Sequence, residues 1–599
     1  MAEKEEMAMG SRRATGFVAV TFASLACIAL AQGPGSVDDA RLEAAVQEPG
    51  NWLTYGGDLG GQRFSRLDQI DRENVGRLAP AWIYQMGAPG VTQTHPLVVD
   101  GVLYVTTAGS DVAAIDAATG VELWRYDHEM SRPVSGERNR GPAVGYGRVY
   151  VATEDERVVA LDQETGAVVW DVKVAPFDAS HLVREGVQAP EPMPFNFRWA
   201  PLVYDGKVVV TATRFEVNEV DADLLADAVA RGEDPGVAWI DANLGRRAFV
   251  AALDAETGDE EWRWYTTREG DWTGGFTATA YDGAVLDRDL EAERELAERY
   301  GLGWAAGSAS PWQIPTVDVE RRLLFVSTGN PAPGHIDLIR PGDNLYSDGI
   351  AAISLDTGEL VWFFQESPHG IYDMTTQNVL FELEHEGRTV PALAGCGKSG
   401  FCYVLDRETG EVLFQTEAVV RQENMYSRGS EEGVRAAPGG LGGVGVTALS
   451  FDPTTGYLYV EGIDAPEVRT LTPVPGAPHL FEMNTESVEG DSKGTVTALD
   501  LYDGGRVVWQ VETPQPVTGG TLATAGGVVF SGESNGAFNA YDAATGDLLW
   551  SFQVGGPITA PPMTYEVDGR QYVAVASGGA ATRTQRGGAL LVSFALPAE

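Results

Sequence analysis

The three cysteines of this 599-residue chain are spaced in a way that indicates possible chemistry. Cys27 lies in an apolar N-terminal run, whereas Cys396 and Cys402 flank Gly-Lys-Ser-Gly in what reads as a β-hairpin. Two cysteines that face each other across a hairpin can form a disulfide in an oxidising compartment, and they stay buried thiols in a reducing one. The sequence leaves both alternatives open. It has no Cys-x-x-Cys-His motif, so we expect no c-type haem on this chain.

A short sequence that recurs along the chain predicts the strands that would position the reactive residues. It first appears at 114–124 as Ala-Ile-Asp-Ala-Ala-Thr-Gly-Val-Glu-Leu-Trp, and later copies end at Trp170, Trp262, Trp362, Phe414, Trp509 and Trp550. Each copy predicts a strand, a tight turn and a strand, because the Asp can cap the turn and the Gly supplies its positive φ. A turn does not explain the aromatic residue four positions after the Gly. We expect that ring to bury against the neighbouring copy, as in propellers and solenoids.

An unfinished unit at the start of the series favours a closed ring. Trp82 precedes Trp124 by 42 residues, nearly the step of 41 between Trp509 and Trp550, but it lacks its own Asp-x-x-Thr-Gly. We expect the C-terminal runs 571–575 and 589–594 to supply its missing strands, because closure removes exposed sheet edges. The eight aromatic positions predict eight blades. Acidic, helix-like insertions are expected near 217–235 and 286–300.

Composition and charge limit the class of protein and its partners. The 72 glycines and many short Val, Ile, Leu and Tyr runs are typical of an all-β protein. The formal charge is 42 − 86 = −44. Such a charge repels nucleic acids and anionic membranes, and it attracts a cationic protein partner. We therefore expect no nucleic-acid partner.

The N-terminal segment 1–31 reads as a cleavable signal peptide. Arg12 and Arg13 precede the apolar run 17–30, and Ala-Leu-Ala at 29–31 fits a cleavage site. A twin-arginine signal and a lipoprotein box are weaker alternatives. The run is short for a membrane anchor, and we expect no stable membrane span elsewhere. This predicts a signal peptide at 1–31, a linker at 32–50 and a single β-propeller domain at 51–599, in a protein that is periplasmic or secreted.

Four phrases resemble one family; three lie outside the repeat, and the fourth overlaps the copy that ends at Phe414. They are Thr-Gly-Asn-Pro at 328–331, Arg-Pro-Gly-Asp-Asn-Leu-Tyr at 340–346, Pro-His at 368–369 with Tyr-Asp at 372–373, and Tyr-Val-Leu-Asp-Arg-Glu-Thr-Gly at 403–410. In this order they resemble the pyrroloquinoline-quinone (PQQ) dependent alcohol and sugar dehydrogenases, over residues 51–594. The resemblance implies an all-β, eight-bladed β-propeller with Trp-docking motifs, closed by N- and C-terminal strands. It also implies that PQQ and Ca²⁺ bind near the ring axis.

The resemblance assigns roles to residues outside the repeat. Glu216 and Asn330 match the metal ligands, and a carboxylate with an amide suits Ca²⁺. Asp373 matches the catalytic base that takes the proton of the substrate hydroxyl. Thr375 stands where lanthanide-using relatives carry a second Asp, which points to Ca²⁺. The positions that match cofactor-binding residues are Gln93, Arg140, Arg198, Thr213, Trp312 as the stacking platform, and Lys398.

Several positions depart from the family pattern. Val134 and Ser135 replace a vicinal Cys pair, Gln93 replaces a Glu, and Arg198 replaces a hydroxyl residue. Thr213, Arg214 and Phe215 replace small residues, Gly445 and Val446 replace an Asn and a Trp, and Phe530 replaces a late ring residue. These changes indicate that the pocket face opposite Trp312 is rebuilt.

The sequence therefore predicts an exported dehydrogenase. It would oxidise an alcohol or sugar hydroxyl to the carbonyl, and pass electrons to cytochrome c or another separate acceptor. One alternative is a non-catalytic propeller of the same repeat type, a periplasmic scaffold or sensor, in which no carboxylate, amide and Trp should converge. Another is a family member that folds but no longer binds PQQ.

Overall fold

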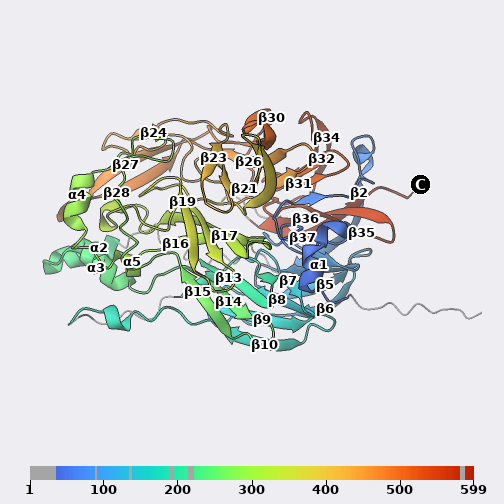
Figure 1. Cartoon of the computed structure of the whole chain (residues 1–599), viewed down its shortest axis with the longest axis horizontal. Coiled ribbons are helices and arrows are strands. Elements are labelled where there is room, and N and C mark those ends of the chain that lie inside the picture. Colours follow the sequence, from blue (N-terminus) through green and yellow to red (C-terminus); the bar gives the residue numbers. More distant parts are fainter. Residues whose placement is uncertain are drawn as a thin grey trace, which may run out of the picture. The chain divides into compact units, whose positions relative to one another are not determined.

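The computed structural model describes residues 35–598, except for 88–90, 134–137, 186, 188–193, 214–221 and 580–586. The expected signal peptide 1–31, the Val134–Ser135 pair, Arg214, Phe215 and the expected metal ligand Glu216 lie outside the described residues. Figure 1 shows that strands dominate the described part of the chain.

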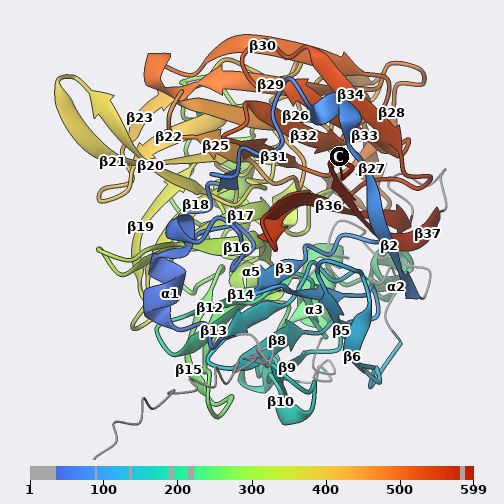
Figure 2. The same ribbon diagram turned by 90° about the vertical axis from the view of Figure 1, so that its right-hand side faces the viewer.

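Four-stranded antiparallel sheets follow one another along the first half of the chain (Figures 1 and 2). The first comprises β3 (Leu97–Val99), β4 (Val102–Thr106), β5 (Val112–Asp116) and β6 (Glu122–Tyr126). The second comprises β7 (Ala143–Gly145), β8 (Arg148–Ala152), β9 (Arg157–Asp162) and β10 (Val168–Lys173). The third comprises β12 (Leu202–Tyr204), β13 (Lys207–Thr213), β14 (Phe249–Asp254) and β15 (Glu260–Tyr265), with β11 (Asn196–Phe197) also paired to β13. The fourth comprises β16 (Ala309–Asp318), β17 (Leu323–Pro331), β18 (Gly349–Ser354) and β19 (Leu360–Gln365).

The second half of the chain repeats the pattern. One sheet comprises β20 (Val379–His385), β21 (Arg388–Cys396), β22 (Cys402–Asp406) and β23 (Val412–Gln415). The next comprises β25 (Ser450–Asp452), β26 (Tyr457–Asp464), β29 (Lys493–Asp500) and β30 (Arg506–Thr513). Another comprises β31 (Thr521–Thr524), β32 (Val528–Gly532), β33 (Ala537–Asp542) and β34 (Leu548–Gln553), joined by β1 (Phe64–Ser65). A smaller sheet of β24 (Val434–Ala436), β27 (Glu467–Val474) and β28 (Ala477–Ser487) departs from the four-stranded repeat.

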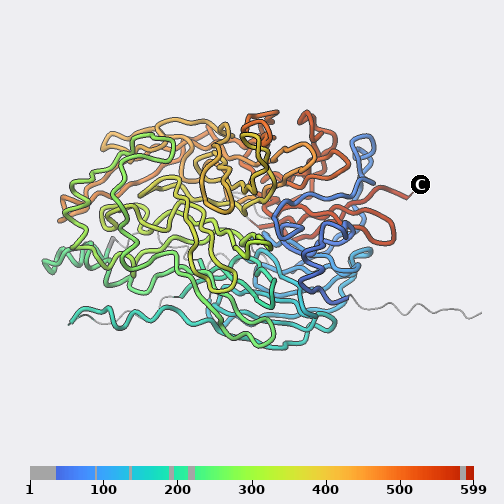
Figure 3. Tube along the Cα trace, in the orientation of Figure 1, coloured from blue at the N-terminus to red at the C-terminus, as the bar shows by residue number. Residues whose placement is uncertain are grey.

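One sheet joins strands from opposite ends of the sequence. β2 (Ala79–Gly87) pairs with β37 (Gly587–Ala595), which pairs with β36 (Arg570–Gly579) and then β35 (Met563–Val567). The trace in Figure 3 shows the blue β2 segment beside the red C-terminal strands. Trp82 lies opposite Ser593 in this register. The unit that lacks its own turn phrase therefore obtains three strands from residues 563–595; β36 and β37 contain the two runs that the sequence predicts, and β35 is an additional strand.

Six of the eight predicted docking aromatics, all of them tryptophans, contact the turn glycine of the next unit, as their spacing predicts. Trp262 illustrates the contact: its indole N–H donates to the carbonyl of Leu355 at 2.9 Å, and its ring covers Gly358. A Cβ at Gly358 would lie 2.4 Å from that ring, and the residue has a φ of +68°, so glycine is required there. The same contact is made by Trp82, Trp124, Trp170, Trp362 and Trp509, whose indoles donate to Ala117, Gln163, Ala255, Arg407 and Ala543.

Helices interrupt the strands in a few places. α2 (Ala222–Arg231) and α3 (Pro235–Asn243) lie between β13 and β14, and α4 (Leu290–Leu296) and α5 (Gly303–Ala306) lie between β15 and β16. Short 3-10 turns occupy Val75–Arg77, Ser180–Leu182, Asp337–Ile339 and Leu501–Asp503. None of the helices within the described ranges combines the length and apolar character that crossing a bilayer requires.

The described part of the expected linker is folded. It contains α1 (Asp39–Glu43) and a 3-10 turn at Ala45–Gln47. Leu42 is buried, and Arg41 forms ion pairs with Glu48 and Asp100 at 2.9 and 2.6 Å. Because one apolar side chain and one ion pair reach the first sheet, this segment packs on the fold instead of connecting to it loosely.

Candidate functional site

The carboxylate of Asp373 lies at the centre of the candidate site. Its Oδ1 accepts the indole N–H of Trp312 at 2.9 Å and the backbone N–H of Asn330 at 2.7 Å. Its Oδ2 lies 2.5 Å from the ammonium of Lys398. The side chain of Asp373 is only 2% exposed. A carboxylate, an amide residue and a tryptophan therefore converge, as expected for an enzyme and not for a scaffold.

Paired strands bring these residues together. Trp312 lies in β16 and Asn330 near the end of β17, and these strands pair antiparallel with irregular register around Trp312. Gly329 between them is required, because a Cβ there would lie 2.1 Å from the Trp312 indole nitrogen and 2.3 Å from Asp373 Oδ1. The backbone N–H of Met374 donates to Thr328 at 3.2 Å, which ties the segment of Asp373 to β17.

A second tryptophan extends the site toward Arg140. The Trp199 ring packs edge-on against Trp312, with centroids 6.2 Å apart and planes at 90°. The Arg140 guanidinium lies 3.7 Å from the centroid of Trp199 on its other side, a cation–π contact. The sequence interpretation missed Trp199. Trp312 was selected by the family resemblance, whereas Trp199 was not; both lack the Asp-x-x-Thr-Gly lead, and that absence could have separated Trp199 from the docking tryptophans.

Arginines gather around Arg140. Burial, together with the positive charges of Arg138 and Arg198, lowers the pKa of Arg140 to about 9. Arg198 donates from Nε to Glu154 at 2.9 Å, and burial raises the pKa of that carboxyl to about 7 despite the nearby arginine. One nitrogen of the buried Arg140 guanidinium has no hydrogen-bond partner among the described residues. The site can therefore accept an anionic ligand such as a carboxylate.

The remaining predicted cofactor residues are placed less directly. Thr213 ends β13, is buried, and donates from its hydroxyl to the carbonyl of Asn196 at 3.2 Å. The side-chain oxygen of Gln93 is buried and accepts no hydrogen bond from the described residues. It keeps the free acceptor that its sequence match predicts. Direct contact of either residue with a cofactor stays a prediction.

The metal site is placed only in part. The backbone N–H of Asn330 donates to the Asp373 carboxylate, so the residue that carries the predicted amide ligand adjoins that carboxylate, and amide and carboxylate oxygens are ligands that Ca²⁺ prefers. The other expected ligand, Glu216, is outside the described residues. Among those described, no group of three His, Cys, Asp or Glu side chains could hold a metal. Ca²⁺ binding therefore stays a prediction.

A buried acid near the site was also missed. Neither carboxylate oxygen of Asp348 has a hydrogen-bond partner in the described structure. Burial raises the pKa of Asp348 well above its usual range, and the charge of Asp373 raises it further. Both effects favour the protonated form of Asp348. No local pattern marks it, because it stands between the Tyr346 phrase and β18.

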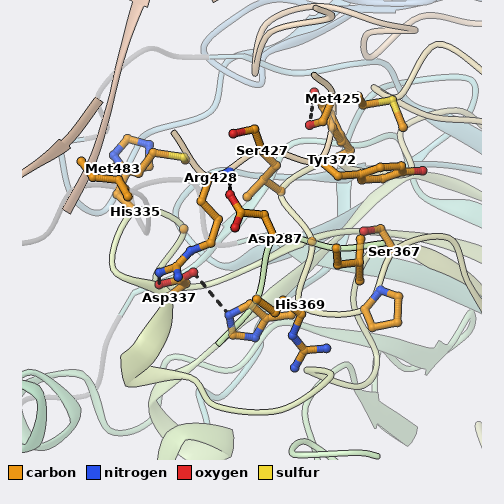
Figure 4. Close-up of a pocket in the computed structure, with 18 of the residues that line it drawn as sticks. Asp287, His335, Asp337, Ser367, His369, Tyr372, Met425, Ser427, Arg428 and Met483 are labelled. Atoms are coloured by element: carbon orange, nitrogen blue, oxygen red, sulfur yellow. Dashed lines mark hydrogen bonds and ion pairs between the residues drawn. The ribbon is translucent and has the colours of Figure 1, made fainter. Parts of the chain in front are cut away.

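A cavity that is partly open to solvent adjoins the segment that leads to Asp373 (Figure 4). Tyr372, His369, Met425 and Met483 line it, together with Arg428, which is paired with Asp337 at 2.5 Å. The residues that hold the Asp373 carboxylate do not line it. Tyr372 therefore lines this cavity, whereas its chain neighbour Asp373 does not and is held instead by Lys398 and the other residues described above.

Comparisons with known proteins agree with this geometry. A family model described as glucose/ethanol/alcohol dehydrogenase, beta-propeller domain (PQQ), matches residues 52–234, 238–425 and 494–573. Quinohemoprotein alcohol dehydrogenase ADH IIB of Pseudomonas putida is 32% identical, over 94% of this chain and 78% of its own. Quinoprotein alcohol dehydrogenase PedH of Pseudomonas putida is 30% identical, over 90% of this chain and 88% of its own.

Solved structures show the same similarity. The quinohemoprotein alcohol dehydrogenase from Comamonas testosteroni superimposes with a TM-score of 0.74 and 28% identity, over 94% of this chain and 83% of its own. A europium-containing methanol dehydrogenase gives a TM-score of 0.72 and 26% identity, over 93% of this chain and all of its own. The chain belongs to the PQQ-dependent alcohol dehydrogenase family, with the all-β propeller fold of that family.

Proposed function

We propose that this protein is a PQQ-dependent dehydrogenase that oxidises an alcohol or sugar hydroxyl to the carbonyl. The convergence of Trp312, Asn330 and Lys398 on the Asp373 carboxylate carries this proposal. Relatives named as alcohol dehydrogenases, at 30–32% identity over most of the chain, support it. The scaffold alternative is disfavoured, because it predicts no such convergence on Asp373.

The fold we propose is an eight-bladed ring. Eight sheets of four or five strands occur in the described ranges, and each would form one blade. The sheet of β2 and β35–β37 would close the ring, since it unites strands from both ends of the sequence. Trp550 supports this order, because its ring packs 5.3 Å from that of Phe594 in β37.

The residues fit PQQ and Ca²⁺ as bound groups. Trp312 would supply a flat face, Arg140 would pair with a carboxylate of the cofactor through its unpartnered nitrogen, and Lys398 would contact its oxygens. Asn330, with Glu216, would hold Ca²⁺. When bound, PQQ supplies the electron-accepting carbonyl, and Ca²⁺ polarises it as a Lewis acid.

The role of Asp373 is to take the proton of the substrate hydroxyl. A general base must be held within hydrogen-bonding distance of that proton. The N–H groups of Trp312 and Asn330 fix one carboxylate oxygen, and Lys398 fixes the other. Burial around the carboxylate excludes bulk water from the transfer. We propose Asp373 as the catalytic base.

We further propose export and a separate electron acceptor. The N-terminal segment 1–31 has the features of a signal peptide, and a disulfide joins Cys396 to Cys402, as is usual in oxidising compartments. Of the two states that the sequence left open for these cysteines, the structure contains the disulfide. Because the 599 residues contain no c-type haem motif, electrons would pass to cytochrome c or another acceptor.

Reconstitution tests this function. The purified protein, supplied with PQQ and Ca²⁺, should bind the quinone and reduce an artificial dye with alcohols, aldoses or polyols. Asp373→Asn should keep quinone binding and lower kcat by about 10²–10⁴-fold, the usual contribution of a positioned base. No quinone binding and no turnover by the native chain would refute the proposed function. Full turnover by the variant would refute Asp373 as the base.

A further inference from the structure

The hairpin between β21 and β22 carries both Lys398 and the disulfide. Cys396 ends β21 and Cys402 begins β22, and they face each other in register. Between them, the N–H of Gly397 donates to Phe401 at 3.2 Å and that of Gly400 donates to Gly397 at 3.0 Å. Lys398 therefore sits at the tip of a tight loop whose two ends are covalently joined.

The loop contacts Asp373 twice through Lys398. The backbone N–H of Lys398 donates to the carbonyl of Asp373 at 2.8 Å, and its ammonium lies 2.5 Å from the carboxylate. Because both contacts involve the same two residues, a shift of the loop by one or two ångströms would weaken both at once.

A second segment confines the loop from the other side. The N–H of Val444 donates to Gly397 at 3.0 Å. A Cβ at Gly443 would lie only 1.8 Å from the carbonyl oxygen of Lys398, so the two backbones are in direct contact. The N–H of Cys396 donates to the hydroxyl oxygen of Thr376 at 2.9 Å. Residues 373–376 and 443–444 thus enclose the loop.

The loop sequence by itself does not favour one position. Gly397 and Gly400 flank the Lys-Ser pair, and glycine loses more backbone freedom on ordering than any other residue. The lysine ammonium stands on a flexible four-carbon stem. A cross-link between the loop ends removes part of that freedom. Both cysteines are fully buried, so the cross-link lies inside the site's supporting structure.

We infer that the Cys396–Cys402 disulfide is a positioning device that holds the Lys398 ammonium on the Asp373 carboxylate. The two cysteines touch neither reacting group and act through Lys398. The inference rests on the proposed function only for its effect on turnover, since the geometry concerns the chain's own residues.

Chemical labelling of lysines tests this positioning without turnover. The full-length protein, and the variant Cys396→Ala/Cys402→Ala, are methylated reductively, and each lysine is quantified by peptide mass spectrometry. Lys207, paired with Asp205 at 3.0 Å on another sheet, serves as the internal reference. We expect the ratio of Lys398 to Lys207 labelling to rise about fivefold in the variant, the scale of coupling between residues that share a contact. An unchanged ratio in a folded variant would overturn the inference.

A matched variant separates positioning from stability. Thr416→Val removes the hydroxyl that accepts the N–H of Cys402 at 3.1 Å, and it leaves the disulfide intact. It should lower Tm but not change Lys398 labelling. A rise equal to that of the double variant would show that any weakening of the hairpin releases Lys398, against the inference. If the double alanine variant does not fold, Cys396→Val/Cys402→Ala restores buried volume and carries the same expectation.

Turnover gives a second readout. In protein reconstituted with PQQ and Ca²⁺, the double variant should lower kcat about fivefold and alter the pH profile of kcat, as coupling through Lys398 requires. A kcat and pH profile equal to those of the native protein would count against the inference. Absence of any dehydrogenase activity in the native protein would refute the proposed function alone, because labelling needs neither cofactor nor substrate.

Discussion

At the scale of single residues, a buried carboxyl group makes the stability of the folded protein depend on pH. Glu461 in β26 is fully buried, accepts the Ser531 hydroxyl at 2.7 Å and accepts the N–H of Gly520 at 2.6 Å. Burial raises the pKa of Glu461 to about 7, although these hydrogen bonds oppose the rise, and the charge of Glu533 adds to it. The folded state therefore binds this proton more tightly than the unfolded state, and stability falls as the pH rises from about 4.5 to 7.

Glu461→Gln should relieve that cost. The amide keeps both contacts, because its oxygen can accept from Gly520 and its NH₂ can donate to the Ser531 oxygen. The variant should be more stable than the native protein by roughly 2–3 kcal/mol at pH 8, and the gain should disappear toward pH 4. Thermal unfolding at both pH values measures this. Equal Tm differences at pH 8 and pH 4 would contradict it.

At the scale of strands and sheets, the contacts of the docking tryptophans hold neighbouring sheets together. Trp262 ends one unit and covers Gly358 in the turn of the next. Its replacement by Ala removes a large buried ring and a hydrogen bond, so it should destabilise the protein by about 3–5 kcal/mol. Trp262→Phe keeps most of the ring and should lose about 1–2 kcal/mol, mostly the indole hydrogen bond to Leu355. Denaturant unfolding compares the two, and equal losses would show that ring packing contributes little.

The repeat spacing was sufficient to predict these elements. An aromatic residue at a constant distance after a turn glycine has one economical partner, the next copy, and the structure confirms this at Trp82 and Trp262. The small sheet of β24, β27 and β28 was not predicted, because its strands lie outside the repeat. The folding of α1 was missed because its support is Asp100, an ion-pair partner 59 residues away.

Short phrases predicted the centre of the site but not its surroundings. Trp312, Asn330 and Lys398 were selected from separate phrases, and the structure brings them to Asp373. Trp199 and Asp348 were not selected. Their roles depend on contacts with residues distant in sequence, which local spacing does not encode.

At the scale of the whole molecule, strand pairing between the two ends is essential. Deletion of residues 587–599 removes β37, with the fully buried Leu591 and Phe594, from between β2 and β36. β2 would lose its one described strand partner and β36 would keep only β35, so we expect loss of cooperative unfolding and of soluble protein. Deletion of only 597–599 spares β37 and should leave Tm unchanged. Calorimetry of both truncations checks this, and normal unfolding of the longer deletion would refute a structural need for β37.

The net charge of −44 governs encounters with an electron acceptor. If the acceptor is a cationic cytochrome c, its reduction should slow by about tenfold as ionic strength rises from ~10 to ~200 mM, because salt screens the attraction. Reduction of an uncharged dye should change little. Stopped-flow measurements with both acceptors make the comparison, and equal salt dependence would show that charge does not guide the encounter.

The pairing of β2 with β37 also constrains the order of folding. β2 ends at Gly87 and β37 begins at Gly587, so β2 is made early and its partner last. During synthesis, β2 keeps unpaired backbone N–H and C=O groups until β37 has been made. Such exposed strand edges invite aggregation. The final sheet can form only after the whole chain has been released. If the export that we propose takes place on the unfolded chain, this last sheet would form on the far side of the membrane.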